Sequence, residues 1–226
     1  MKFQVFTFLV LSTLILSSCS GYRLRKKNNP FIWYDIRTVS IPMFTNQTTL
    51  PFVSSPMTKE IFLLLSEYKG LRVYPGINKS TDAVLLGIVG STNKLDQTIK
   101  TISTTTVKAL DGGESAIGAR QDFLIPKEST LNLKLTLILV KKPLKGELEV
   151  LSSSLGKHVS VHPKVIFYES FDLTSTFERT RFNDSDNGLR GHEVNFTQNR
   201  GKVNRAVDDV AKVAATKFKE LILRAF

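Results

Sequence analysis

The sequence predicts an α+β domain, a two-layer sandwich in which two helices pack on a mixed four-to-five-stranded sheet. Two observations lead to this prediction. Segments such as 129–142 (STLNLKLTLILVKK) alternate apolar and polar residues, as a half-buried strand does, and two other segments repeat apolar residues at the helical period. Because the apolar face of such strands must be buried against another element, we expect both helices to pack on that face of the sheet.

The first elements of this domain follow a short N-terminal region. Val39, Ile41 and Met43 or Phe44 indicate a strand around Pro42 that ends in a polar turn. The next segment, SSPMTKEIFLLLSEYKG, predicts a helix with Ser55 as N-cap, proline at its first position and glycine just past its end. Its apolar residues recur at the helical spacing and predict a face buried in the core.

The following segments predict the rest of the sheet and its second helix. LRVYP (71–75) and DAVLLGIVGST (82–92) indicate strands, the second with glycines that permit a bend or close packing. QTIKTISTTTV (97–107) is a strand with at least one face in water, because serine and threonine occupy both faces. The long strand 129–142 follows, and KVIFYESFDLTSTFERTRF (164–182) resumes strand character.

Two further segments complete the chain. Residues 143–164 have no clean period and are predicted as an insertion, and 183–193 (NDSDNGLRGHE) as a polar loop. The C-terminal segment is the strongest helix, with an apolar seam that we expect to cover the sheet rather than to form a coiled coil or lie on a membrane. The predicted seam consists of Val203, Val207, Val210, Ala214, Phe218, Leu221 and Ala225.

Composition permits one sizeable core and favours an anionic partner. The chain has 226 residues, 42% of them hydrophobic, and its net charge of +11 comes from 31 Lys and Arg against 20 Asp and Glu. Such a charge suits nucleic acid, anionic lipid or a phosphorylated glycan, although in many basic proteins it merely opposes self-association.

The N-terminus predicts export and a lipid anchor. A basic start, the apolar run VFTFLVLSTLIL (5–16) and two serines form a signal peptide over residues 1–18. As a helix the run spans only about 18 Å, too short for a bilayer core of about 30 Å. Leu16-Ser17-Ser18-Cys19 resembles the bacterial lipobox, which predicts acylation of Cys19, the sole cysteine. Ser20 in place of aspartate resembles the signal for the outer membrane, and export disfavours nucleic acid as partner.

Residues 19–34 then form the acylated N-terminus and a short tether, and 35–226 a single domain that contains the insertion 143–164.

No pattern indicates catalysis, a cofactor or a metal site. His158 and His162 have a spacing that suits a metal on a helix, but on the predicted strand they lie about 13 Å apart. NDSDNG resembles a calcium loop, yet position twelve of that loop is Val194 rather than glutamate. We therefore predict a non-enzymatic protein without cofactor.

Three stretches resemble the LptE family, the lipoprotein partners of the lipopolysaccharide translocon LptD. They are CSGYRLR (19–25), VSIPMFTNQT (39–48) and AVDDVAKVAATKFKELI (206–222), and the order of predicted elements matches as well. The resemblance implies an outer-membrane lipoprotein seated in the lumen of the LptD barrel. There it would plug and support the barrel and assist delivery of lipopolysaccharide to the outer leaflet.

Four lysines are candidate contacts for the phosphates of lipopolysaccharide, because anionic groups need accessible cations. The phase of the predicted strands, and no family motif, selects Lys100, Lys134, Lys141 and Lys142. The alternative is that these lysines only keep the sheet edges solvated.

A second functional class is an LpoB-like outer-membrane lipoprotein that activates a peptidoglycan synthase. It would need a long tether to cross the periplasm, whereas only about ten residues separate Cys19 from the apolar FIWY at 31–34. The short tether favours the translocon partner.

Overall fold

A computed structural model describes residues 28–78, 80–92, 98–108, 122–152, 162–180 and 190–225. Residues 1–18 and Cys19 lie outside this part, so the predicted signal peptide and acylation site remain predictions. The elements in chain order are η2 (Ile32–Tyr34), β1 (Thr38–Ile41), β2 (Thr45–Asn46), α2 (Ser54–Ser66), β3 (Arg72–Pro75), β4 (Ala83–Gly90), β5 (Ile99–Lys108), β6 (Asp122–Lys141), α3 (Lys145–Ser152), β7 (Val165–Glu178) and α4 (Arg190–Ala225).

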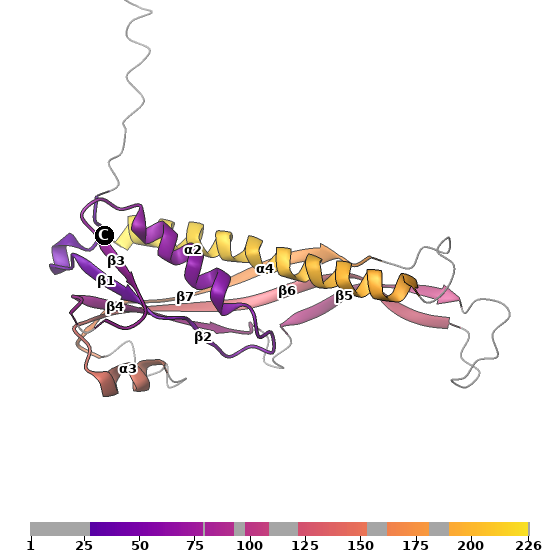
Figure 1. Cartoon of the computed structure of the whole chain (residues 1–226), viewed down its shortest axis with the longest axis horizontal. Helices are drawn as coiled ribbons and strands as arrows, with labels where there is room; N and C mark the ends of the chain where they lie inside the picture. The colour runs from indigo at the N-terminus through magenta and orange to yellow at the C-terminus, as the bar shows by residue number, and fades with distance from the viewer. Residues whose placement is uncertain are drawn as a thin grey trace, which may run out of the picture.

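The strands form one mixed sheet organised around β6. β7 pairs with β6 along one edge, while β4 and β5 pair with successive stretches of its other edge, all antiparallel. β1 and β2 pair with successive parts of β4, β3 pairs with β1, and these three pairings are parallel. The molecule is therefore elongated, and α4 runs along its length above the sheet (Figure 1).

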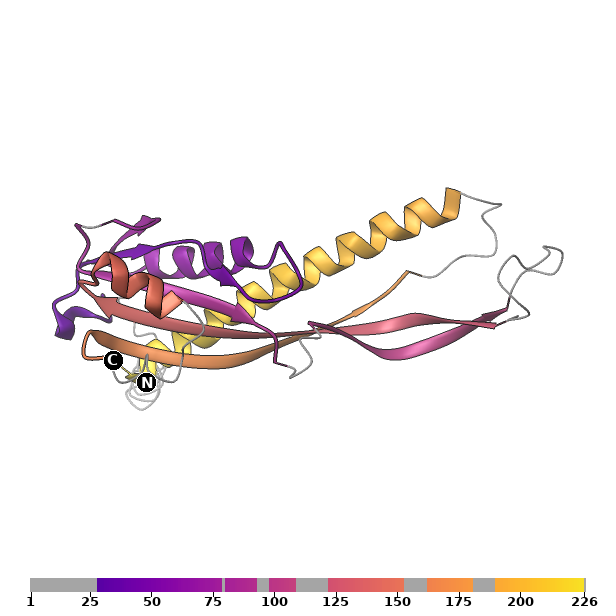
Figure 2. The same ribbon diagram turned by 90° about the horizontal axis from the view of Figure 1, so that it is seen from below.

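The prediction of an α+β fold with a mixed sheet is confirmed, but the described residues form seven strands and three α-helices rather than four to five strands and two helices. The additional helix, α3, lies within the predicted insertion 143–164. It packs on the face of the sheet opposite to α2 and α4 (Figure 2).

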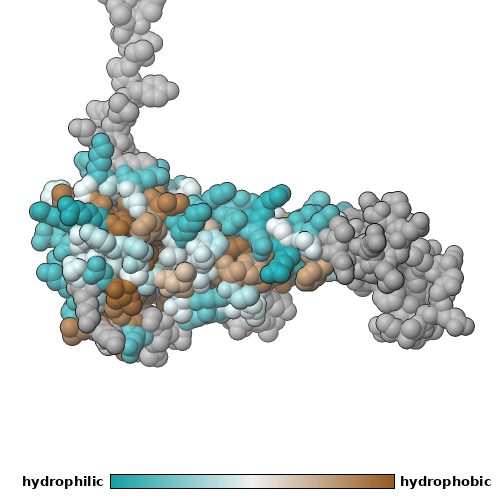
Figure 3. Space-filling model, in the orientation of Figure 1, coloured by the Kyte–Doolittle hydropathy of each residue, from teal (hydrophilic) through white to brown (hydrophobic). Residues whose placement is uncertain are grey.

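The main core lies between that sheet and helices α2 and α4. Alternate residues of β6 are completely buried and face the helices, namely Leu131, Leu133, Leu135, Leu137 and Leu139. They meet buried residues of α4, namely Ala206, Val207, Val210, Ala211, Ala214, Phe218 and Ile222. The outward surface of α4 is mostly hydrophilic (Figure 3). The predicted packing of the C-terminal helix on the sheet is thus confirmed.

Two predicted details were wrong at helix starts. α2 begins at Ser54 after Val53, with no side-chain cap, so Ser55 is not the N-cap. Instead, Thr58 connects the helix to the sheet: its hydroxyl donates to the Ser54 carbonyl at 2.7 Å and accepts from the Phe44 amide at 3.0 Å. α4 begins at Arg190, inside the predicted loop 183–193. Its first turns contain glycine, asparagine and threonine, which are weak helix formers, so the local sequence does not indicate the helix there.

Within the described residues, no helix is both long and apolar enough to cross a membrane.

Candidate functional site

The face of the sheet opposite to α2 and α4 is polar along much of β6 and β7. Thr136 and Ser170 face each other there with their hydroxyl oxygens 3.0 Å apart, and Thr130 pairs with Thr176 at 3.5 Å. Lys134, midway along β6, is exposed and lies opposite the exposed Asp172. This hydroxyl-rich surface suits the binding of a polar group better than further packing.

Two of the four predicted lysines lie on this polar face. Lys100 of β5 is exposed and pairs with Thr130, which is on the same face as Lys134. Lys134 lies four positions beyond Thr130 along β6, so the two lysine backbones are offset by about 14 Å along the strand. Side chains of this length could engage two anionic groups of one large ligand or approach one group from both sides.

The other two predicted lysines lie at the end of β6, about 24 to 27 Å beyond Lys134 along the strand. Lys141 donates from Nζ to the carbonyl oxygen of Tyr34 at 2.7 Å and thereby holds η2. Lys142 has a φ of 42° and lines a pocket under α3. The structure therefore distributes the four lysines over three places, with only Lys100 and Lys134 on one surface.

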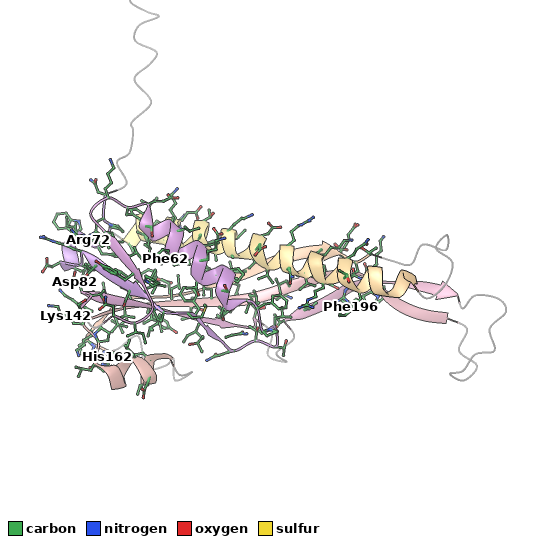
Figure 4. The ribbon with its side chains drawn as sticks, in the orientation of Figure 1. Phe62, Arg72, Asp82, Lys142, His162 and Phe196 are labelled. Carbon is green, nitrogen blue, oxygen red and sulfur yellow. The ribbon has the colours of Figure 1, made fainter. Side chains whose placement is uncertain are left out.

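A pocket of about 1030 Å³ lies between α3 and the first half of β4. Its apolar wall includes Val84, Leu86 and Leu148, which belong to a second hydrophobic cluster separate from the main core. Its lining also includes exposed apolar residues and several polar or charged ones, namely Met43, Ile77, Asn78, Ser80, Asp82, Lys142, Leu144 and Glu149. Asp82 and Lys142 come from neighbouring loops at this end of the sheet (Figure 4). A largely apolar pocket of this size can hold a hydrocarbon chain.

Asp82 fixes one wall of this pocket. Its Oδ2 accepts hydrogen bonds from the amides of Arg37 and Thr38 at 3.0 and 2.9 Å, and from the Thr38 hydroxyl at 2.8 Å. Burial alone would raise the pKa of Asp82, but these hydrogen bonds and the positive charge of Lys142 hold it below its ordinary value. Asp82 directly precedes β4, so its carboxylate holds the start of β4 next to the start of β1.

Glu147 holds α3 over the pocket. Its carboxylate accepts hydrogen bonds from Lys164 Nζ at 2.8 and 2.9 Å and from the Leu144 amide at 2.7 Å, and His162 lies 4.0 Å away. The hydrogen bond from Lys164, that from the Leu144 amide and the positive charge of Lys164 lower the pKa of Glu147. His162 is labelled in Figure 4, next to α3. Its predicted companion His158 lies outside the described residues.

Replacing Asp82 with alanine is expected to lower the free energy of unfolding at neutral pH by about 1 to 2 kcal/mol, because three donors lose a charged acceptor that is partly exposed. A carboxyl with a lowered pKa stabilises the fold above its ordinary pKa of 3.8, and that stabilisation is lost as the pH falls through the folded-state value. Urea unfolding at pH 7 and pH 3 should therefore show a smaller difference between wild type and Asp82→Ala at pH 3.

The matched control is Asp209→Ala, since Asp209 is exposed and 3.9 Å from Lys212. We expect it to change stability by less than about 0.5 kcal/mol. An equal loss in both variants would contradict the role given to Asp82.

The sequence did not predict the pocket, because its walls come from segments 42–45, 77–86 and 142–149, and α3 was taken as part of an insertion. The only local signals were the apolar β4 segment and leucines in 144–151. Among the described residues, no group of three His, Cys, Asp or Glu side chains could hold a metal ion.

No protein-family model and no curated protein sequence matches this chain. Several solved structures resemble it weakly, and bacterial lipoproteins are prominent among them. A candidate lipoprotein from Caulobacter crescentus is 9% identical, with a TM-score of 0.37 over 80% of this chain and 87% of that one. The minor lipoprotein from Acinetobacter baumannii is 10% identical, with a TM-score of 0.33 over 80% and 90%.

Rare lipoprotein B from Shewanella oneidensis is 8% identical, with a TM-score of 0.26 over 80% of this chain and 98% of that one. At such identities and TM-scores the likeness does not indicate a function for this chain.

Proposed function

We propose that this chain is an LptE-like outer-membrane lipoprotein that plugs and supports an LptD-type barrel and assists the insertion of lipopolysaccharide into the outer leaflet. In this role it works by binding and needs no catalytic residue or cofactor. The resemblance of the three sequence stretches suggests the family, and the position of Cys19 relative to the folded domain carries the proposal.

Only eight residues lie between Cys19 and Asn28, which forms a bridge with Lys69 at the start of the described structure. Even a fully extended chain of this length spans no more than about 30 Å. If Cys19 is acylated, the domain stays close to the membrane that holds the acyl chains. A protein embedded in that membrane is then a nearer partner than one across the periplasm.

Lipopolysaccharide has both chemical features that the candidate surfaces could accommodate. Its phosphates suit the exposed amines of Lys100 and Lys134, beside hydroxyl groups that can donate further hydrogen bonds. Its acyl chains suit the apolar pocket under α3, whose lining includes Lys142. The two sites lie on the same side of the sheet as α3, opposite to the main helices.

The partner is tested by purifying the tagged, acylated full chain from solubilised outer membranes and identifying co-purifying proteins by mass spectrometry. We expect a large β-barrel protein in stoichiometric amount. A matched preparation of the Cys19→Ala variant, which cannot be acylated, should lose it. Recovery of a penicillin-binding synthase without a barrel would contradict the proposal and favour the LpoB-like alternative.

The lysine face is tested by reversing two charges. The double variant Lys100→Glu/Lys134→Glu should bind lipopolysaccharide about tenfold more weakly or worse, because two attractive charges become repulsive. The melting temperature should fall only slightly, since both side chains are exposed and the one new like-charge pair is that between position 134 and Asp172. Titration of the full chain with fluorescent lipopolysaccharide measures the affinity.

A control with the same change in net charge is Lys59→Glu/Lys212→Glu on the exposed surfaces of α2 and α4. It should bind nearly as well as the wild type. Equal affinity of both double variants would rule out a role for Lys100 and Lys134.

A further inference from the structure

The 3₁₀ turn η2 presents two large apolar side chains to solvent. Trp33 is 85% exposed and Ile32 is 60% exposed, whereas the preceding Phe31 is buried in the main core. η2 lies at the end of the molecule where the described chain begins, drawn in indigo at the left of Figure 1. Exposure of two adjacent large apolar residues at a domain end is typical of a contact surface.

Several hydrogen bonds hold this turn in place. The Asn29 side chain donates to the Ile36 carbonyl at 2.6 Å and accepts from the Phe31 amide at 2.9 Å, which closes the loop at its base. Asp35 takes a φ of 55°, and its amide donates to the Ile32 carbonyl. With Lys141 bonded to the Tyr34 carbonyl, the turn is fixed from both sides and projects Ile32 and Trp33 outward.

The charge around η2 is predominantly basic. Arg37 adjoins the turn in sequence, Arg72 pairs with the start of β1, and both are exposed. Lys141 holds the turn, and Asp35 is the exposed acidic residue next to it. The eight residues between Cys19 and Asn28, which directly precede the described chain, include four more basic residues. An apolar tip beside cations matches a phospholipid surface with anionic headgroups.

We propose that η2 is a second membrane contact, in which Trp33 and Ile32 enter the interfacial layer of the leaflet that carries the acyl chains of Cys19. Tryptophan favours this layer because its ring is apolar and its N–H finds polar partners there. The inference rests on the acylation of Cys19 in the proposed function, since the short chain from Cys19 keeps η2 within reach of that leaflet. Two contacts would orient the long axis of the domain, whereas a lipid anchor alone would let the domain rotate.

The test uses the fluorescence of Trp33, which is the only tryptophan of the chain. The acylated full chain is reconstituted into vesicles of phosphatidylethanolamine and phosphatidylglycerol, with or without brominated acyl chains, which quench tryptophan at short range. We expect brominated vesicles to quench Trp33, and its emission to shift to shorter wavelength relative to the protein in solution. Quenching by acrylamide should decrease in parallel.

The matched control moves the reporter to the opposite end of the molecule. Phe196 on α4 is 70% exposed and lies far from Arg72 and the η2 end (Figure 4). In the variant Trp33→Phe/F196W, the new indole should show no quenching by brominated lipid and should remain accessible to acrylamide. Equal quenching at both positions would indicate unspecific adsorption and overturn the proposal.

Separate readouts distinguish this inference from the proposed function. Mass spectrometry of the Cys19 peptide and flotation with vesicles report the anchor. If the protein is acylated and vesicle-bound but brominated lipid does not quench Trp33, only the proposed membrane contact of η2 is wrong. The same holds if Trp33 becomes protected from acrylamide only when a barrel protein is added. A quenched Trp33 without a co-purifying barrel overturns the proposed partner alone. A protein that is neither acylated nor vesicle-bound overturns both.

Discussion

Replacing Phe218 with alanine is expected to lower the free energy of unfolding by about 4 kcal/mol. Phe218 is 1% exposed and its ring meets that of Phe167 edge to face, with centroids 5.7 Å apart. The pair joins the C-terminal half of α4 to β7, so its loss leaves a cavity between the helix and the sheet. Alanine has a higher helix propensity than phenylalanine, so the expected loss of stability comes from packing. Urea unfolding followed by circular dichroism measures the change.

The control for this variant is Val213→Ala on the exposed side of the same helix, where the side chain is 43% exposed. A change below about 1 kcal/mol is expected there, because less apolar area is removed from burial. If both substitutions had similar small effects, α4 would not depend on packing against β7 in the way described.

Replacing Gly87 with valine is expected to cost about 3 kcal/mol, because a Cβ at this position would overlap the ring of Phe44. Phe44 is 3% exposed and follows the break at Pro42 between β1 and β2, which pair with successive parts of β4. Its ring lies directly on the backbone of Gly87. Strand propensity alone predicts the opposite sign, since valine favours strands and glycine does not.

Two further variants separate this clash from other causes. Gly90→Val lies in the same strand, but a Cβ there meets no atom within 4 Å, so it should be neutral or stabilising. The double variant Phe44→Ala/Gly87→Val should be less destabilised than the sum of its single variants by about 1 kcal/mol or more, because the removed ring makes room for valine. Strict additivity would contradict the steric explanation.

The periodic parts of the chain could be predicted from the sequence. Alternating leucines predicted that one face of β6 is buried, and all five of them are. The apolar seam of the C-terminal segment predicted a helix that covers this face, and Val207, Val210 and Phe218 do so. Both predictions succeed because burial of one face imposes a period on the sequence that is independent of distant segments. The exposure of Lys134 followed from the same alternation.

The relations between distant segments had no such signal. β4 and β5 share one edge of β6, and α3 covers the face of the sheet opposite to α2 and α4. Both features depend on contacts between distant segments, and the local sequence pattern of each segment fits several arrangements. For the same reason the sequence placed four lysines together as candidates, whereas the strand lengths and turns separate Lys141 and Lys142 from Lys100 and Lys134. The nature and charge of the side chains are local properties, but which of them share a surface depends on strand register and on the path of the chain, and these are set only when the core is packed.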